Sequence, residues 1–252
     1  MTRRTAALAL MAGPLVAARK PKVLILTGSA DELYHHWRET TPAFVEMFSP
    51  FETKVVDDIH PRIRKDIRDS DMVFLNYNGP RFPPDVEKEL EDFVRGGGGF
   101  AAYHMASYGE FFGMVFEKKW RDAGPGWLEY PKMIGAKWEA AKIGHARRTT
   151  FAVEWVRKQH PIAGENFETS DELYHRMTIL PGTEILAQAL SPADKGGTGN
   201  YEPMIWVNRY GKGRVFFTTL GHDVDALTRP GVKQAMVRGV EWAATGKVTY
   251  GK

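Results

Sequence analysis

Residues 97–106, with the sequence GGGFAAYHMA, decide the fold that the sequence predicts. The glycines end the preceding segment, and the short apolar run at 100–103 is typical of a buried strand. His104 follows this run directly, with Ala102 and Ala106 two positions to either side. Small residues are needed at these positions where a backbone reverses sharply after a strand. The stretch therefore predicts a strand that ends in a tight elbow with an imidazole at its apex. A histidine hydrogen-bonded inside a turn is the alternative.

The glycines at 96–99 also invite comparison with a phosphate-binding loop. Such a loop follows a strand and opens a helix, because the helix N-terminus contributes the anion site. Here the glycines precede the strand. We interpret them as a helix stop that lies close to the sheet, and we predict no nucleotide site there.

Strands and helices alternate on both sides of this stretch. Apolar runs at 23–27, 54–56 and 72–75 predict strands, and 41–48, 62–68 and a segment opened by Pro83-Pro84-Asp85 predict helices. Further strands are expected at 149–154, 184–189, 204–207 and 214–218, with a hairpin turn at 210–213 and a final helix at 231–244. The pattern predicts one α/β domain, a mostly parallel central sheet flanked by helices, with its functional groups at the carboxyl ends of the strands. Residues 111–143, rich in aromatic residues and glycine, are predicted to form a pocket-forming insertion.

The composition excludes several classes of site. The chain has 252 residues, of which 43% are hydrophobic and 26% charged, as is ordinary for a globular protein. The formal net charge is only +3, and the basic residues are spread among acids, which argues against a nucleic-acid partner. Cysteine is absent, so disulfides, thiolate metal sites and cysteine nucleophiles are excluded. Any metal must be bound by histidine and carboxylate.

The N-terminus predicts export. Thr2-Arg3-Arg4 precedes an apolar run at 6–12 and small residues up to Ala18, which is the pattern of a signal peptide at 1–20 ahead of a domain at 21–252. The run is too short to span a bilayer, so we expect no membrane span in the mature chain. A periplasmic or extracellular location follows. The adjacent arginines also suggest a twin-arginine address, although an ordinary secretory signal often carries two basic residues. A disordered N-terminal arm is the alternative to export.

The candidate catalytic residues are His104, His222 and Glu172. The strand at 214–218 ends in a glycine turn followed by His222, so both histidines are expected at the same edge of the sheet. Two imidazoles of near-neutral pKa suit general acid and base catalysis. Glu172 lies in the sequence SDELYH at 170–175, an unusual density of ionisable groups.

A second set of residues is predicted to bind a sugar. Tryptophan beside carboxylates and arginine is typical of carbohydrate sites, because sugar faces stack on indoles while charged groups bind hydroxyls. Core packing is the alternative for Trp206, and capping of a turn is the alternative for Asp223. The predicted substrate-binding residues are Trp37, Asp171, Tyr174, Glu202, Trp206, Arg209 and Asp223.

The histidines also predict a divalent-metal site. His36, His104 and His222 are the candidate ligands, and imidazoles with a carboxylate suit zinc or manganese. His145 and His160 are interpreted as structural.

These segments together resemble the ThuA-like (trehalose utilisation) family. The resemblance covers nearly the whole chain after the signal and is carried by an ordered series of motifs: His36-Trp37-Arg38-Glu39-Thr40-Thr41-Pro42, residues 97–104, His160-Pro161-Ile162, Asp171-Glu172-Leu173-Tyr174, Glu202-Pro203-Met204-Ile205-Trp206, and residues 209–223. It implies a flavodoxin-like fold similar to the class I glutamine amidotransferases. Those enzymes place cysteine at the elbow where this chain has His104, so cysteine-dependent amidotransferase activity is not expected.

The resemblance also implies sugar catabolism, with 3-keto-disaccharides as candidate substrates. The leading hypothesis is a hydrolase or lyase that acts on a disaccharide or 3-keto-glycoside by hydrolysis, elimination or isomerisation. A non-catalytic carbohydrate-binding protein of the same fold and an interaction module are the alternatives.

Overall fold

The computed structural model describes residues 19–29 and 34–251 of the chain. The predicted signal peptide at 1–20 lies outside this range except for Arg19 and Lys20. Within the described residues, no helix is both long enough and apolar enough to cross a membrane.

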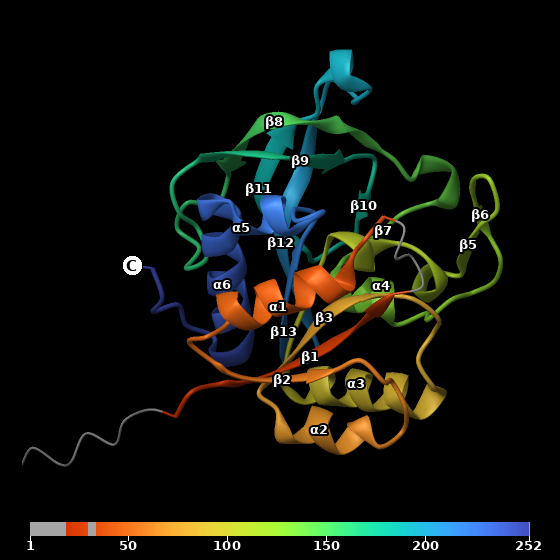
Figure 1. The fold of residues 1–252 in the computed structure, drawn as a ribbon, viewed down its shortest axis with the longest axis vertical. Coiled ribbons are helices and arrows are strands. Elements are labelled where there is room, and N and C mark those ends of the chain that lie inside the picture. The colour runs from red at the N-terminus through yellow and green to blue at the C-terminus, as the bar shows by residue number, and fades with distance from the viewer. Residues whose placement is uncertain (1–18, 30–33, 252) are drawn as a thin grey trace, which may run out of the picture.

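One large sheet organises the described chain. Its strands are β1 (Lys22–Ser29), β2 (Glu52–Val56), β3 (Met72–Asn78), β4 (Gly99–Tyr103), β8 (His145–Trp155), β9 (Phe167–Tyr174), β11 (Glu184–Leu190), β12 (Tyr201–Tyr210) and β13 (Gly213–Thr218). Their order across the sheet is β2-β1-β3-β4-β13-β12-β11-β8-β9 (Figure 1). The expected hairpin turn at 210–213 is confirmed, since it joins the antiparallel strands β12 and β13.

The sheet has a parallel half and an antiparallel half. Strands β2, β1, β3, β4 and β13 are parallel, whereas β12, β11, β8 and β9 each pair antiparallel with the strand before them. The expectation of a mostly parallel sheet is therefore wrong for the second half. The reason is the length of the connections, because a parallel crossover needs a dozen or more residues, usually a helix. The links between β8, β9, β11 and β12 are too short for that.

The parallel half has the strand order of a flavodoxin-like fold. Numbered within that half alone, β2-β1-β3-β4-β13 reads 2-1-3-4-5. The chain leaves β1 toward one side and returns at β3 on the other, and ligands bind outside the carboxyl ends of the strands at such a switch point. Strands β8 and β9 lie above the parallel strands in Figure 1.

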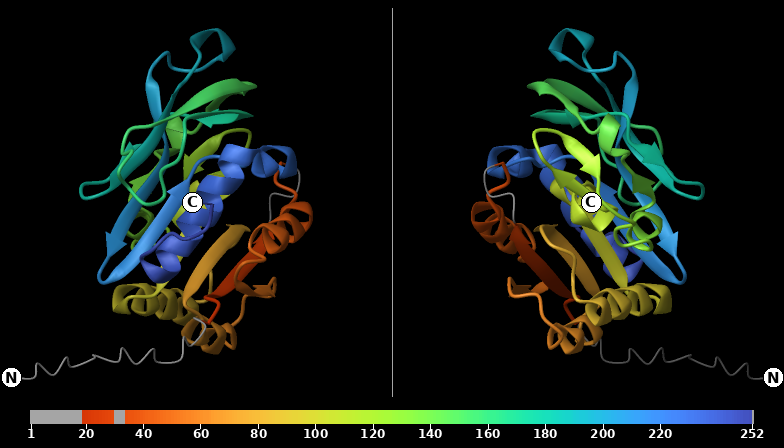
Figure 2. Two further views of the ribbon diagram at one scale, coloured as in Figure 1. Left: turned by 90° about the vertical axis from the view of Figure 1, so that its left-hand side faces the viewer. Right: turned by 90° about the vertical axis from the view of Figure 1, so that its right-hand side faces the viewer.

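Helices cover both faces of the parallel half (Figure 2). On one face, Phe44 of α1 and Phe48, which caps its end, share a core with Val240 of α6. On the other face, Ile67 of α2 and Leu90 of α3 share a second core. The helices are α1 (Trp37–Met47), α2 (Ile63–Asp69), α3 (Pro84–Gly96), α4 (Tyr130–Ile134), α5 (Val224–Thr228) and α6 (Pro230–Thr245), with 3-10 helices η1 (His104–Ser107), η2 (Glu110–Phe112), η3 (Ala140–Lys142) and η4 (Ala193–Lys195).

The segment at 111–143 folds into short elements. It contains α4, η3 and the strands β5 (Met114–Phe116), β6 (Trp120–Asp122) and β7 (Ala136–Lys137). β5 pairs with β6, and β7 pairs with β10 (Thr178–Ile179). Elements of two to five residues are too short to leave a periodic pattern, which is why the sequence predicts no regular structure here.

The glycines at 96–99 differ in the space around them. An added Cβ at Gly99 would lie 2.5 Å from the backbone oxygen of Ala243 in α6, whereas at Gly96 it would meet no atom within 4 Å. Gly99 therefore sets how closely α6 approaches β4. Gly96 only ends α3.

We predict that Gly99→Ala lowers the free energy of unfolding by about 1–3 kcal/mol, because the new methyl group pushes on backbone that cannot move away. Gly96→Ala is the matched control and should be neutral or stabilise by about 0.4–1 kcal/mol, since alanine restricts the unfolded chain. Urea unfolding followed by tryptophan fluorescence measures both. Equal midpoints for the two variants would contradict the close approach.

Candidate functional site

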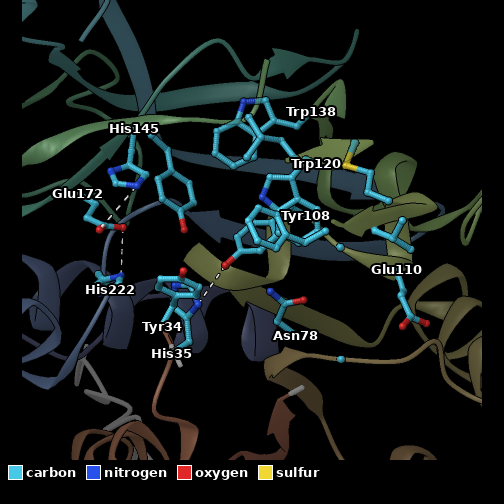
Figure 3. A pocket seen from close by; sticks show the side chains of 17 residues that line it. Tyr34, His35, Asn78, Tyr108, Glu110, Trp120, Trp138, His145, Glu172 and His222 are labelled. Atoms are coloured by element: carbon cyan, nitrogen blue, oxygen red, sulfur yellow. Dashed lines mark hydrogen bonds and ion pairs between the residues drawn. The ribbon is translucent and has the colours of Figure 1, made fainter. Parts of the chain in front are cut away.

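A cavity of about 620 Å³ opens at the carboxyl ends of the parallel strands. His145, Glu172 and His222 lie together on one side of it, and Tyr108, Trp120 and Trp138 lie across from them, on the same side as Asn78 and Glu110 (Figure 3). The polar side includes His35, His145, Glu172, Tyr174 and His222. The aromatic side is formed by Tyr108, Phe116, Trp120 and Trp138, whereas Tyr34 lies next to His35 (Figure 3).

Two histidines meet because their strands are neighbours. Thr218 at the end of β13 pairs with Tyr103 at the end of β4, so the residues that follow both strands emerge side by side. His104 takes a φ of +33°, which is the expected strained elbow. Gly221, with φ +107°, supplies the turn before His222, and an added Cβ there would meet Leu227 at 2.5 Å. The Nε2 atom of His104 lies 3.3 Å from Nδ1 of His222.

His104 is a fully buried, neutral imidazole. Its Nδ1–H donates to the carbonyl oxygen of Thr219 at 2.7 Å, which leaves the lone pair on Nε2. The hydroxyl of Tyr174 donates to that lone pair, also at 2.7 Å. Burial, together with the nearby His35 and His222, holds the pKa of His104 well below its usual value.

His222 and Glu172 form the charged pair of the site. Nδ1 of His222 lies 3.1 Å from Oε2 of Glu172, and each side chain is 20% exposed. Burial alone would lower the pKa of His222, but the hydrogen bond and charge of Glu172, with Asp171 and Asp223, raise it. Burial opposes ionisation of Glu172 as well, yet the contact with His222 lowers its pKa. His145 approaches the other oxygen of Glu172 at 3.8 Å.

Asp171 positions this pair without entering the cavity. Its buried carboxylate accepts the backbone N–H groups of Gly221 at 2.6 Å and His222 at 3.2 Å, and that of Glu172 at 2.8 Å. Burial raises its pKa to about 6, although the three backbone donors pull the pKa down. The carboxylate therefore fastens β9 to the turn that follows β13.

The third imidazole beside His104 and His222 is His35, not His36. The ring centroid of His35 lies 5.2 Å from that of His104 and 5.0 Å from that of His222, and one ring nitrogen from each of the three lies within 4.8 Å of the others. The metal set with His36 is therefore wrong. His36 is the N-cap residue of α1 and its side chain is exposed, since neighbouring residues at this turn point in different directions.

Five of the predicted site residues are brought together: His104, His222, Glu172, Asp171 and Tyr174. Trp206 instead lies in the core with no exposed surface, where it donates to the carbonyl of Ile134 and stacks on Phe217. Trp37 opens α1 with Arg38 stacked on its ring at 4.3 Å. Neither tryptophan lines the cavity.

The remaining predicted residues have structural contacts elsewhere. Glu202 accepts the backbone N–H of Arg176 and the hydroxyl of Thr198. Arg209 is exposed and lies over the ring of Trp242 at 5.7 Å. Asp223 caps α5 by accepting the N–H of Ala226 and pairs with Arg148, which was the alternative considered for it.

Several cavity residues were not selected from the sequence. The sequence predicts a structural role for His145 and gives Trp120 and Trp138 only as part of the insertion at 111–143, while Tyr108 precedes that segment. The signal that could have identified the three aromatic residues is the high aromatic content of a glycine-rich stretch. This stretch has no helix or strand periodicity, so its aromatic side chains are not explained by packing of a regular element into the core. Tyr108 also contacts Nδ1 of His35 through its hydroxyl at 3.0 Å.

Comparisons with known proteins support the resemblance. The model of a family described as ThuA, trehalose utilisation, matches residues 22–243. A ThuA-like protein from Parabacteroides merdae is similar with a TM-score of 0.76 and 25% identity, over 93% of each chain. One from Bacteroides uniformis has a TM-score of 0.70 and 16% identity, over 94% of this chain and 98% of that one.

A more distant likeness concerns the fold alone. A β-galactosidase from Rahnella sp. R3 has a TM-score of 0.53 and 18% identity, over 88% of this chain but 31% of that one. No protein with a curated description matches the sequence.

We predict that His222 titrates above its ordinary pKa and that Glu172→Gln lowers the midpoint of this titration. Burial lowers the pKa of His222, and the variant removes the carboxylate that opposes this effect. A raised folded-state pKa means that the contribution of His222 to stability is present below about pH 6.5 and is lost as pH rises through its folded pKa. The lowered pKa of Glu172 means that the contribution of Glu172 is lost as pH falls through its own folded pKa. Long-range ¹H–¹⁵N spectra of the imidazoles against pH measure the midpoint, with His222→Gln for assignment. Glu168→Gln, on the exposed face of the same strand, is the control. An unchanged midpoint in Glu172→Gln would contradict the pairing.

Proposed function

Since this chain belongs to the ThuA family of trehalose utilisation, we propose that it is a sugar-active enzyme that acts on a disaccharide or its 3-keto derivative. The observation that carries the proposal is the ion pair of His222 and Glu172 at the side of a cavity whose opposite wall is aromatic (Figure 3). Export through the signal predicted at residues 1–20 is part of the same proposal.

The cavity suits a sugar of this size. Its volume of about 620 Å³ lies within the range of small-molecule sites, about 300–1,000 Å³. Tyr108 and Trp120 pack edge to face with centroids 5.1 Å apart and give the wall a firm surface on which sugar faces stack. Asn78 and Glu110 line the same cavity and offer hydrogen-bonding groups for hydroxyls.

The ion pair can catalyse an elimination from a 3-keto-glycoside. The ketone acidifies the neighbouring C–H bond, so a carboxylate can serve as the general base. Glu172 accepts the proton from carbon 2, and the electron pair of the broken C–H bond forms a double bond to carbon 1. The bond from carbon 1 to the glycosidic oxygen breaks, and His222 donates a proton to the departing oxygen. Addition of water to the double bond then completes a net hydrolysis.

His104 supports this pair from behind. It is fully buried and does not line the cavity, so direct proton exchange with a sugar is less suitable for it than for His222. Its Nε2 faces His222 at 3.3 Å and Glu172 at 3.9 Å. We assign it a positioning role in the reaction, in place of the catalytic role expected from the sequence.

We predict that Glu172→Gln lowers turnover of 3-keto-trehalose by about 10²–10⁴-fold, the usual contribution of a general base. An NMR time course with trehalose and 3-keto-trehalose, with and without added zinc or manganese, detects the product and identifies the bond that breaks. His36→Ala, next to the site in sequence but exposed, should retain wild-type turnover. Saturable sugar binding without any product would instead establish the non-catalytic binding protein, which the aromatic wall also suits.

We predict that Trp120→Ala raises KM by about tenfold and leaves kcat nearly unchanged, because the indole contacts the sugar equally in the ground and transition states. The indole is only half-buried, so folding should be preserved. Leu128→Ala, in the same segment but 65% exposed and outside the cavity, is the control. An unchanged KM in Trp120→Ala would show that this aromatic wall does not contact the sugar.

A further inference from the structure

Three imidazoles converge at the base of the cavity from three different strand ends. His35 follows β1, His104 follows β4 and His222 follows β13. One ring nitrogen from each lies within 4.8 Å of the other two, and the measured distance between Nε2 of His104 and Nδ1 of His222 is 3.3 Å. We propose that these three residues bind a divalent transition-metal ion, of the zinc or manganese class, beside Glu172.

The distances fit a tetrahedral ion. With zinc–nitrogen bonds of about 2.0–2.1 Å, two ligand atoms of a tetrahedron lie about 3.3 Å apart. The pair His104 and His222 already has this separation. Oε2 of Glu172 lies 3.1 Å from Nδ1 of His222 and 3.9 Å from Nε2 of His104, so the carboxylate adjoins the same point. His35 needs to move by about an ångström or two to complete the set.

The surroundings orient the rings as they do in metal sites. A ligating histidine usually donates its other N–H to a carbonyl or carboxylate, which fixes the tautomer. Nδ1 of His104 donates to the carbonyl of Thr219 and so leaves Nε2 for an ion. The hydroxyl of Tyr108 holds Nδ1 of His35 at 3.0 Å. Asp171 fixes the backbone of Gly221 and His222 through two hydrogen bonds.

Charge also favours a cation here. Three protonated imidazoles with centroids 5.0–5.3 Å apart would repel one another strongly in a site with little water. A metal ion places the positive charge at one point, where the lone pairs of the three neutral imidazoles can all coordinate it. On binding, the ion displaces the proton held between His222 and Glu172, so in the metal-bound chain the ion, and not a protonated His222, would stabilise the charge on the departing oxygen. The hydroxyl of Tyr174 then no longer donates to Nε2 of His104.

Only the role of the ion rests on the proposed function. His35, His222 and Glu172 line the cavity (Figure 3), so an ion bound by these residues would be accessible to a sugar in the cavity. There it would polarise the oxygen of a ketone and stabilise the negative charge formed when the neighbouring proton leaves. Binding of the ion itself needs no sugar and is measured separately.

The test is zinc binding by the purified, chelator-treated chain. Titration in competition with a chromophoric chelator, with elemental analysis after dialysis, should give one zinc ion per chain, and cobalt(II) should develop the visible absorption of a tetrahedral site. His35→Ala and His222→Ala should each weaken zinc binding by more than about 100-fold, since a ligand matters more than the outer contacts that orient it. His36→Ala should bind as wild type. His104 is avoided because its full burial makes an unfolded variant expected.

Two results would overturn the metal site: less than stoichiometric zinc in the wild-type chain, or equal zinc affinity in His35→Ala and His36→Ala. The two proposals fail separately. Stoichiometric zinc with no product from any sugar would refute the enzyme and keep the metal. Turnover that persists in chain shown to be metal-free would refute the role of the ion in the reaction and keep the enzyme.

Discussion

The site depends on one buried carboxylate. Asp171 belongs to the edge strand of the antiparallel half, yet its oxygens accept the backbone N–H groups of the turn after β13, in the parallel half. A carboxylate without exposed surface is costly to keep unless its oxygens are fully hydrogen-bonded. Three backbone donors meet that need. Because Glu172 and Tyr174 follow on the same strand, this contact also sets their distance from the imidazoles.

The two halves of the sheet contribute different chemistry. The parallel half supplies His35, His104 and His222 after the ends of β1, β4 and β13, and the antiparallel half supplies Glu172 and Tyr174. Burial favours the neutral form of His104, whereas the contact of His222 with Glu172 favours the charged form of both. A neutral imidazole therefore lies behind a charged pair that reaches the cavity. Neither half alone makes the site.

The sequence predicts the parallel half well because each strand there is an apolar run that ends in polar residues. It does not reveal β9 as a strand, since the inward-facing positions include Thr169 and Asp171 and the alternation of apolar residues is lost. The choice between His35 and His36 depends on where α1 begins, a difference of one residue that no periodicity resolves. The sequence neighbours of Trp206 predict that it binds sugar, but the sequence does not show that its side chain is fully buried.

Three residues of the aromatic wall, Phe116, Trp120 and Trp138, lie in or next to short strands outside the main sheet. β5 and β6 pair only with each other, and β7 pairs with the two-residue β10, so the backbone of the wall shares no strand pairing with the strands that carry the imidazoles. Substitutions there alter the shape of the cavity while the strand ends keep their register. The indole side chains of the cavity and its imidazoles are therefore held by separate sets of backbone hydrogen bonds.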